Sequence, residues 1–143
     1  MKSFNVENRK LKIEEYQALR KSTGWNPVED NLVETALEKD LFSICVYDEE
    51  RIVGIGRIIG DGALYFYIQD IIVLPEYKGL GIGKLIMDNI EIYLGKEANN
   101  NSFIGLMAAD GVRGFYTKYG YEERPKDKPG MYKIMKKPNS NIE

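Results

Sequence analysis

Glycines recur at alternate positions in one short stretch, which runs Tyr-Lys-Gly-Leu-Gly-Ile-Gly-Lys from Tyr77 to Lys84. Alternate glycines let the backbone turn so that several N–H groups point to one spot. A helical spacing of apolar residues begins directly after them, and the start of a helix also attracts negative charge. The stretch therefore predicts an anion-binding loop, and a glycine-rich turn without a ligand is the alternative.

Two common phosphate-binding motifs do not fit this stretch. A P-loop ending at Lys84 would need glycine at position 78, which is Lys78, and serine or threonine at position 85, which is Leu85. A dinucleotide fingerprint starting at Gly79 or Gly81 would need its third glycine at position 84 or 86, and neither is glycine. Neither a nucleotide-triphosphate site nor a dinucleotide site is indicated.

The chain contains no histidine, so serine–histidine and cysteine–histidine pairs and histidine-based zinc sites are excluded. Proton transfer must use Asp, Glu, Tyr, Lys or water. The single cysteine, Cys45, lies in an apolar stretch, which favours a small buried residue over a nucleophile. Asp70 interrupts an apolar run from Tyr65 to Val73, where a carboxylate is costly unless it is paired.

The overall composition is that of one ordinary globular domain: 143 residues, 43% of them apolar and 29% charged. We expect a single domain over residues 1–137 and a polar tail over 138–143. The net charge of −2 and the scattered basic residues disfavour nucleic acid or an acidic membrane as partner. No signal segment or membrane span is evident, so we expect a cytoplasmic location.

The elements that must position these residues are predicted from periodicity and turn signals to form a mixed α/β (α+β) domain. An antiparallel meander leads into the glycine loop, a helix follows it, and Gly95 is expected to end that helix. Asn31 and Glu34 suggest a capping box for an earlier helix. Strands are expected at 4–6, 41–47, 52–59, 64–74, 103–107 and 131–135, and helices at 13–21, from 31, from 82 to Gly95, and from 112 to 119 before Gly120.

Residues 73–83 resemble motif A of the GCN5-related N-acetyltransferase (GNAT) superfamily, whose pattern is Arg or Gln, two residues, Gly, one residue, then Gly or Ala. Lys78, Gly81 and Gly83 stand at those positions, with Lys78 replacing Arg or Gln. Residues 114–121, which include Phe115-Tyr116 and Gly120-Tyr121, are similar to motif B. The resemblance extends to the element order over nearly the whole chain. It implies the acyl-CoA N-acyltransferase fold, a mostly antiparallel mixed sheet flanked by helices.

This resemblance implies that acetyl-CoA is the co-substrate, and we expect no metal. The strand before the loop would offer its backbone to the pantetheine arm, and one of its amides would polarise the thioester carbonyl. Tyr116 corresponds to the general acid that returns a proton to the CoA thiolate; a core aromatic is the alternative. The implied acetyl-CoA contacts are Ile71, Ile72 and Val73 on the strand, and Lys78, Gly79, Leu80, Gly81, Ile82, Gly83 and Lys84 in the loop.

The acceptor side is indicated by two further residues. Residues 67–73 resemble the corresponding strand of diamine acetyltransferases, with Gln69 where those carry Glu. Asp70 is therefore a candidate to bind an ammonium group or relay its proton through water; the alternative is an acid satisfied by backbone N–H groups at a strand bulge. Trp25, in the break between the first two helices, is a candidate wall of the acceptor site or an anchor of that loop.

Together these features predict an acetyl-CoA-dependent N-acetyltransferase that acts on a primary amine of a small molecule by direct attack on the thioester. Two alternatives stay open: a protein or peptide N-acetyltransferase, and a CoA-binding module without turnover. Homodimers are common among members of the superfamily, and the sequence leaves the oligomeric state open.

Overall fold

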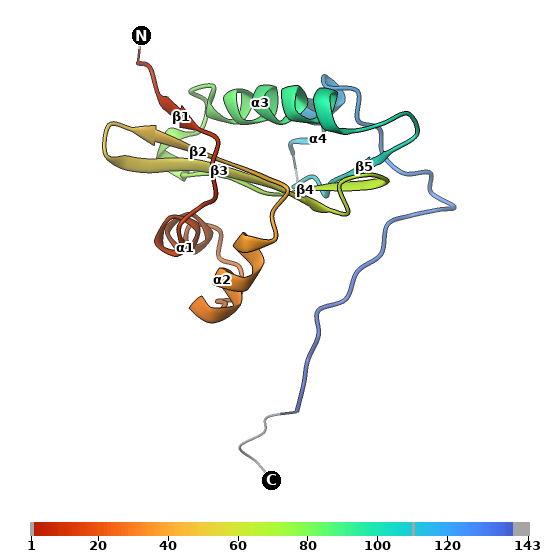
Figure 1. Cartoon of the computed structure of the whole chain (residues 1–143), viewed down its shortest axis with the longest axis horizontal. Helices are drawn as coiled ribbons and strands as arrows, with labels where there is room; N and C mark the ends of the chain where they lie inside the picture. Colours follow the sequence, from red (N-terminus) through yellow and green to blue (C-terminus); the bar gives the residue numbers. More distant parts are fainter. Residues whose placement is uncertain (1, 110, 139–143) are drawn as a thin grey trace. The chain divides into compact units, whose positions relative to one another are not determined.

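The computed structural model describes residues 2–109 and 111–138 of the chain (Figure 1). It divides into two compact units, Met1–Met107 and Ala108–Glu143. The first unit holds β1 (Asn5–Glu7), α1 (Ile13–Lys21), α2 (Asp30–Glu38), β2 (Phe42–Asp48), β3 (Arg51–Gly60), β4 (Tyr65–Val73), the 3₁₀ turn η1 (Pro75–Tyr77), α3 (Ile82–Glu97) and β5 (Phe103–Gly105). The second holds α4 (Arg113–Thr117).

The first unit is built on a five-stranded sheet in the order β1-β2-β3-β4-β5. The first four strands are antiparallel neighbours, and β5 runs parallel to β4. Pairing between β4 and β5 ends at Tyr67 and Gly105, although β4 continues to Val73. The mixed, mostly antiparallel sheet flanked by helices confirms the predicted fold class.

Helices cover both faces of this sheet: α1 and α2 lie on one side and α3 on the other (Figure 1). Two glycines of β3 let α3 pack closely. A Cβ on Gly54 would lie 2.7 Å from the Ile82 side chain, and one on Gly56 would lie 2.8 Å from Ile86. Glycine is needed at these positions because α3 lies close to the strand, not because of the backbone angle. This close packing holds the first turn of α3 against the sheet.

Several expected boundaries are corrected by the structure. Helix α2 begins at Asp30, with Glu29 at the N-cap and no side-chain cap, so the capping box at Asn31 is wrong. Helix α3 passes through Gly95 and ends at Glu97. Gly95 does not adopt the left-handed angle of a helix-ending glycine, and Ala98 N–H donates to Leu94 C=O at 2.9 Å, so helical hydrogen bonding continues past it.

The expected last strand over 131–135 is wrong. No strand follows β5 in the described part of the chain. The side chains of this segment are exposed, from 64% for Ile134 to 86% for Met131. Its apolar residues provide strand propensity, but a strand forms only against a neighbour. Among the described helices, none is long and apolar enough to cross a membrane.

Candidate functional site

The glycine loop takes the shape that its sequence indicates. Gly79 and Gly81 adopt left-handed φ angles of +81° and +87°, and α3 begins at Ile82. A Cβ at either glycine would meet nothing within 4 Å, so the backbone angle, not space, demands glycine here.

Among residues 2–109 and 111–138, no side chain caps the N–H groups at the start of α3. Leu85 N–H donates to Gly81 C=O at 3.0 Å, so the amides of residues 82–84 precede the first helical bond. No side-chain cap is formed, and the first turn contains no acidic residue. The positive end of this 16-residue helix is therefore uncompensated and suits an anion.

The loop from Lys78 to Lys84 carries two cationic side chains, and its other side chains are neutral. Lys78 and Leu80 are exposed, and Ile82 is buried in the core. Lys84 pairs along the helix with Asp88 at 2.8 Å. The loop thus presents mainly its backbone, with Lys78 and Lys84 as its exposed cations.

The turn that precedes the loop is fixed to the end of the β2–β3 hairpin. Tyr77 O–H donates to Asp48 Oδ2 at 2.6 Å, and Phe4 packs edge-on against the Tyr77 ring. Lys2 Nζ also approaches Asp48, at 3.1 Å. The hydrogen bonds from Tyr77 and Lys2 lower the pKa of Asp48, so this anchor stays charged.

Strand β4 contains a bulge next to the loop. Ile72 pairs with Ile55 and Gln69 with Arg57, so Asp70 and Ile71 together lie opposite the single residue Gly56. Asp70 has a φ of +55° and is the one described non-glycine residue with positive φ that lies in a strand. Because the described pairing with β5 stops at Tyr67, the backbone of 71–73 has no β5 partner.

A buried network of side chains holds Asp70, which is 6% exposed. Its carboxylate accepts hydrogen bonds from Tyr16 O–H at 2.6 Å, Arg57 Nη1 at 2.8 Å and Gln69 Nε2 at 3.0 Å. Arg57 also donates to Asp40, from Nη2 at 2.8 Å and from Nε at 3.0 Å. Burial alone would lower the pKa of Arg57, but its bonds to the two carboxylates raise it, so the guanidinium stays charged.

The structure matches one part of the second interpretation of Asp70. It shows the strand bulge of the second, but the hydrogen-bond donors are side chains of α1, β3 and β4 rather than backbone N–H groups. Both carboxylate oxygens already accept a bond from the chain itself. An incoming ammonium group would have to compete with Arg57 and Tyr16 at Oδ2 or with Gln69 at Oδ1.

Trp25 lies in the connection between α1 and α2, where Gly24 is left-handed with a φ of +77°. The residue is 48% exposed, and the Arg20 guanidinium carbon lies 5.3 Å from the ring centroid. Arg20 Nη1 in turn donates to Tyr16 Oη at 3.1 Å. The two predicted acceptor-side residues, Trp25 and Asp70, are thereby joined through α1.

Tyr116 belongs to the second unit, on α4. Its ring meets Phe115 edge-on at a centroid distance of 5.1 Å, and Phe115 meets Tyr119 in the same way at 5.6 Å. Tyr116 is half-buried, and burial raises its pKa above the ordinary value of 10. The phenol therefore keeps its proton at neutral pH and can donate it.

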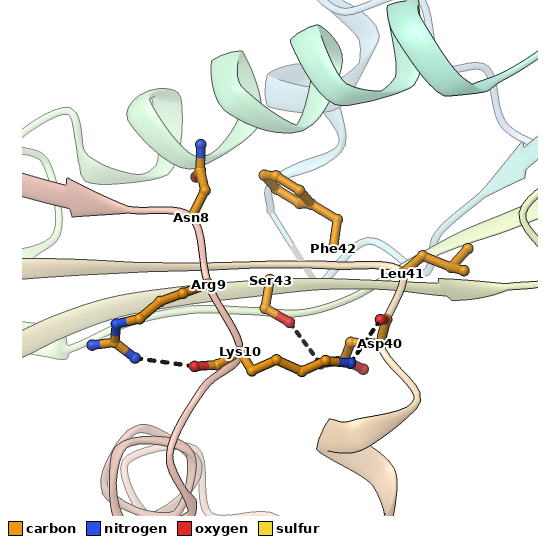
Figure 2. Close-up of a pocket in the computed structure, with 7 residues that line it drawn as sticks. All are labelled: Asn8, Arg9, Lys10, Asp40, Leu41, Phe42 and Ser43. Carbon is orange, nitrogen blue, oxygen red and sulfur yellow. Dashed lines mark hydrogen bonds between the residues drawn. The ribbon is translucent and has the colours of Figure 1, made fainter.

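A hollow of the first unit, between the segment after β1 and the start of β2, has polar groups that the protein itself uses (Figure 2). Lys10 Nζ donates to carbonyls of the last turn of α2, including Leu37 O at 3.4 Å, and to Asp40 O just after the helix at 3.2 Å. Ser43 donates to Asp40 Oδ2 at 2.8 Å. These contacts cap α2 and hold Asp40 in place, so the hollow serves the fold.

The sequence analysis missed Arg57, Asp40 and Tyr16. A signal for the first was present, because Arg57 interrupts the apolar strand 52–59 just as Asp70 interrupts its neighbour. Two opposite charges on adjacent apolar strands indicate a buried pair. Asp40 and Tyr16 lie outside those strands and carry no comparable signal.

Neither a reactive thiol nor a metal centre is found in the described part of the chain. Cys45 is fully buried, as expected, and burial raises its pKa to about 11. No group of three or more Cys, Asp or Glu residues within 2–109 and 111–138 is arranged to hold a metal ion.

Comparison with known proteins identifies the family of this chain. The model of the acetyltransferase (GNAT) domain matches residues 14–130. A ycf52-like N-acetyltransferase of Prochlorococcus marinus, described as uncharacterized, is 30% identical over 122 residues, covering 82% of this chain and 67% of that protein. Serotonin N-acetyltransferase 2, a chloroplastic protein of Oryza sativa, is 35% identical over 82 residues, covering 57% of this chain and 40% of that protein.

A solved structure agrees with this assignment. A protein of meticillin-resistant Staphylococcus aureus, described as a probable acetyltransferase, matches with a TM-score of 0.86 and 34% identity over 93% of this chain and 100% of that chain. The family model spans residues of both units. The chain therefore belongs to the GNAT acetyltransferases and is an acetyl-CoA-dependent N-acetyltransferase.

Proposed function

We propose that the protein transfers the acetyl group of acetyl-CoA to a primary amine of a small molecule. The observation that carries the proposal is the uncapped, acid-free start of α3 behind two left-handed glycines. The amides of Gly79 to Lys84 bind the CoA pyrophosphate, and Lys78 adds a positive charge beside them. A ligand with two adjacent phosphates matches several convergent N–H donors.

The thioester lies along the bulged strand that leads into the loop. Ile71, Ile72 and Val73 have no described β5 partner, so the backbone groups on the edge of β4 that faces away from β3 are available to the pantetheine arm as an added strand. One amide donates to the thioester carbonyl and stabilises the oxyanion, an effect typically worth about 10²–10³ in kcat per donor.

Tyr116 acts as the general acid. The amine nitrogen attacks the thioester carbonyl carbon, the tetrahedral intermediate collapses with cleavage of the C–S bond, and Tyr116 O–H protonates the departing thiolate. The surplus proton of the nitrogen leaves to water, and Tyr116 regains its own from solvent. The raised pKa of Tyr116 keeps this proton in place before attack.

For the acceptor we favour a small amine with an apolar or aromatic body. The half-exposed ring of Trp25 offers a stacking surface, and serotonin N-acetyltransferase 2 is among the similar proteins. Asp70 is occupied by Arg57, Tyr16 and Gln69, so we do not propose a second ammonium group in the substrate. Acetylation of a protein amine is the second candidate function.

The CoA site is tested by thermal denaturation with acetyl-CoA. A ligand that binds only the folded state at a hundredfold excess over its Kd adds about 2.7 kcal/mol to the free energy of unfolding. We expect Gly81→Val to abolish the rise in Tm, since a β-branched residue is strained at a φ of +87°. Gly95→Val, made inside α3, is the matched control and keeps the rise. A protein whose Tm does not respond to millimolar acetyl-CoA would contradict the proposal.

Acceptor and general acid are tested by thiol release from acetyl-CoA with a panel of aryl-alkylamines, aminosugars, polyamines and a lysine peptide. We expect turnover with a small amine, rising with pH as more amine becomes free base. Tyr116→Phe should lower kcat by about 10²–10⁴-fold where chemistry limits the rate, with acetyl-CoA binding unchanged. Turnover confined to the peptide would favour the second function, and an unchanged kcat would remove Tyr116 from the mechanism.

A further inference from the structure

We propose that Arg57, held by Asp40, and Tyr16 are positioning residues for acetyl transfer: together they keep Asp70 in the conformation that creates the β4 bulge, and so direct the backbone amides that follow. The inference rests on the proposed binding of the thioester beside Ile71 to Val73. It assigns a role to a buried charge network that no step of the proposed chemistry uses directly.

The backbone at Asp70 shows that something must hold it. A φ of +55° is uphill for any residue that carries a Cβ, and the other two described non-glycine cases, Glu49 and Asn101, lie in turns. Glycine would take this conformation freely, as Gly79 and Gly81 do in the loop. An aspartate in the middle of a strand persists there only when its surroundings fix it.

Arg57 provides that restraint from the neighbouring strand. It pairs in register with Gln69, next to the bulge, and its Nη1 reaches Asp70 Oδ2 at 2.8 Å. The remaining edge of the guanidinium is held by Asp40, whose side chain is fully buried and accepts a further bond from Ser43. Because the planar guanidinium of Arg57 is held at two edges, it fixes the direction as well as the length of its hydrogen bond to Asp70.

The buried charges of this network indicate that it does more than stabilise the fold. Two buried carboxylates share one guanidinium, so the cluster carries a net negative charge unless Arg20, which reaches Tyr16 Oη, is counted with it. Apolar residues of similar volume are often at least as stabilising as a buried ion cluster. Apolar packing alone fixes the backbone angle of a bulge less well than directed hydrogen bonds do.

The experiment compares changes on one face of the sheet. Tyr16→Phe removes the O–H that donates to Asp70, and Tyr47→Phe removes an O–H that donates to another buried carboxylate, Glu15, away from the bulge. Arg57→Lys keeps the charge but loses the fork. Each variant is examined for the Tm rise with acetyl-CoA, for kcat and KM, and for the infrared carbonyl band of bound acetyl-CoA labelled with ¹³C at the carbonyl.

We expect Tyr16→Phe and Tyr47→Phe to lower the Tm by similar amounts and to keep the rise with acetyl-CoA. In Tyr16→Phe and Arg57→Lys the carbonyl band should move toward that of free acetyl-CoA, because the amide is no longer aimed at it. In Arg57→Lys kcat should fall by about tenfold or more, part of the value of an oxyanion donor, while KM for acetyl-CoA changes little. Tyr47→Phe should keep both the band and kcat.

A carbonyl band and kcat like those of the unaltered protein in Tyr16→Phe and Arg57→Lys would overturn the positioning role. If Arg57→Lys does not fold, the comparison between Tyr16→Phe and Tyr47→Phe decides alone, since both keep the ring. Equal effects in these two would also overturn it. No Tm response to acetyl-CoA in the unaltered protein would overturn the proposed function as well, so the two failures are distinguishable.

Discussion

Asp70 and Glu15 are both buried carboxylates in the first unit, and their surroundings are chemically alike. Asp70 accepts bonds from an arginine and a tyrosine hydroxyl. Glu15 does the same: Arg9 donates from two nitrogens at 2.9 and 2.8 Å, and Tyr47 donates its O–H. The difference lies in the backbone, because Glu15 stands in the first turn of α1 with ordinary helical geometry, whereas Asp70 is left-handed inside a strand.

The two networks are chemically similar but have different roles. Glu15 also accepts the N–H of Lys12 at 2.7 Å, so it satisfies a donor at the start of α1 and ties that helix to the sheet. Its network makes the fold more stable. The network of Asp70 holds a conformation that the chain would otherwise leave, and we assign to it the orientation of the strand that is proposed to bind the thioester.

The largest expected effect concerns Glu15 and pH. Burial alone would raise its pKa, but hydrogen bonds from Arg9, Lys12 N–H and Tyr47 lower it from 4.5 to about 2. The stabilisation is fully present above the unfolded pKa and is lost as the pH falls through the folded pKa of about 2. The difference between the two values corresponds to about 3 kcal/mol.

We expect Glu15→Gln to lower the free energy of unfolding at pH 7 by about this amount and to flatten the loss of stability in acid, as measured by urea denaturation between pH 7 and 2. Glu14→Gln, at an exposed neighbouring position, is the control and should change little. Acetylation by folded Glu15→Gln should match that of the unaltered protein. An unchanged acid limb would show that Glu15 is not the stabilising carboxylate.

A smaller effect on stability is expected from the different backbone conformations of Asp70 and Glu15. At position 70 neither glycine nor alanine can replace the hydrogen bonds of the carboxylate. The difference in stability between these two variants therefore measures the cost of the positive φ alone. We expect Asp70→Gly to be more stable than Asp70→Ala by about 1–2 kcal/mol, the cost of a left-handed residue with a Cβ.

At position 15 the order should reverse, because alanine in a helix is favoured over glycine by about 0.5–1 kcal/mol. Denaturation of the four variants measures both differences. The same order at both positions would contradict the view that Asp70 is strained and Glu15 is not.

The contrast also explains what could be predicted from the sequence. The left-handed residues of the loop were predictable because glycine itself marks them, and helix 13–21 was predictable because its pattern is local. The network of Asp70 joins residues 13 and 54 positions apart in the chain, and only the register of β3 against β4 brings Arg57 beside the bulge. The strand expected at 131–135 failed for the same reason, since a local pattern does not contain the partner.

The smallest effects are expected at the outer ends of the two networks. Glu7 pairs with Arg9 Nε at 2.8 Å and is half exposed, so Glu7→Gln should cost no more than about 1 kcal/mol. That cost should disappear in about 1 M salt, where exposed charges are screened within a few ångström. Urea denaturation at low and high salt measures it.

Trp25→Leu is the corresponding change at the outer end of the Asp70 network, where the ring lies against Arg20. Losing the cation–π contact at an exposed site costs about 0.5–1 kcal/mol, which makes the two variants similar in stability. They should differ in activity: Trp25→Leu should raise KM for an aromatic amine, while Glu7→Gln should leave it unchanged, because only one of the two networks ends at the proposed acceptor site. An unchanged KM in Trp25→Leu would make Trp25 an anchor of its loop and confine the role of the Asp70 network to the thioester.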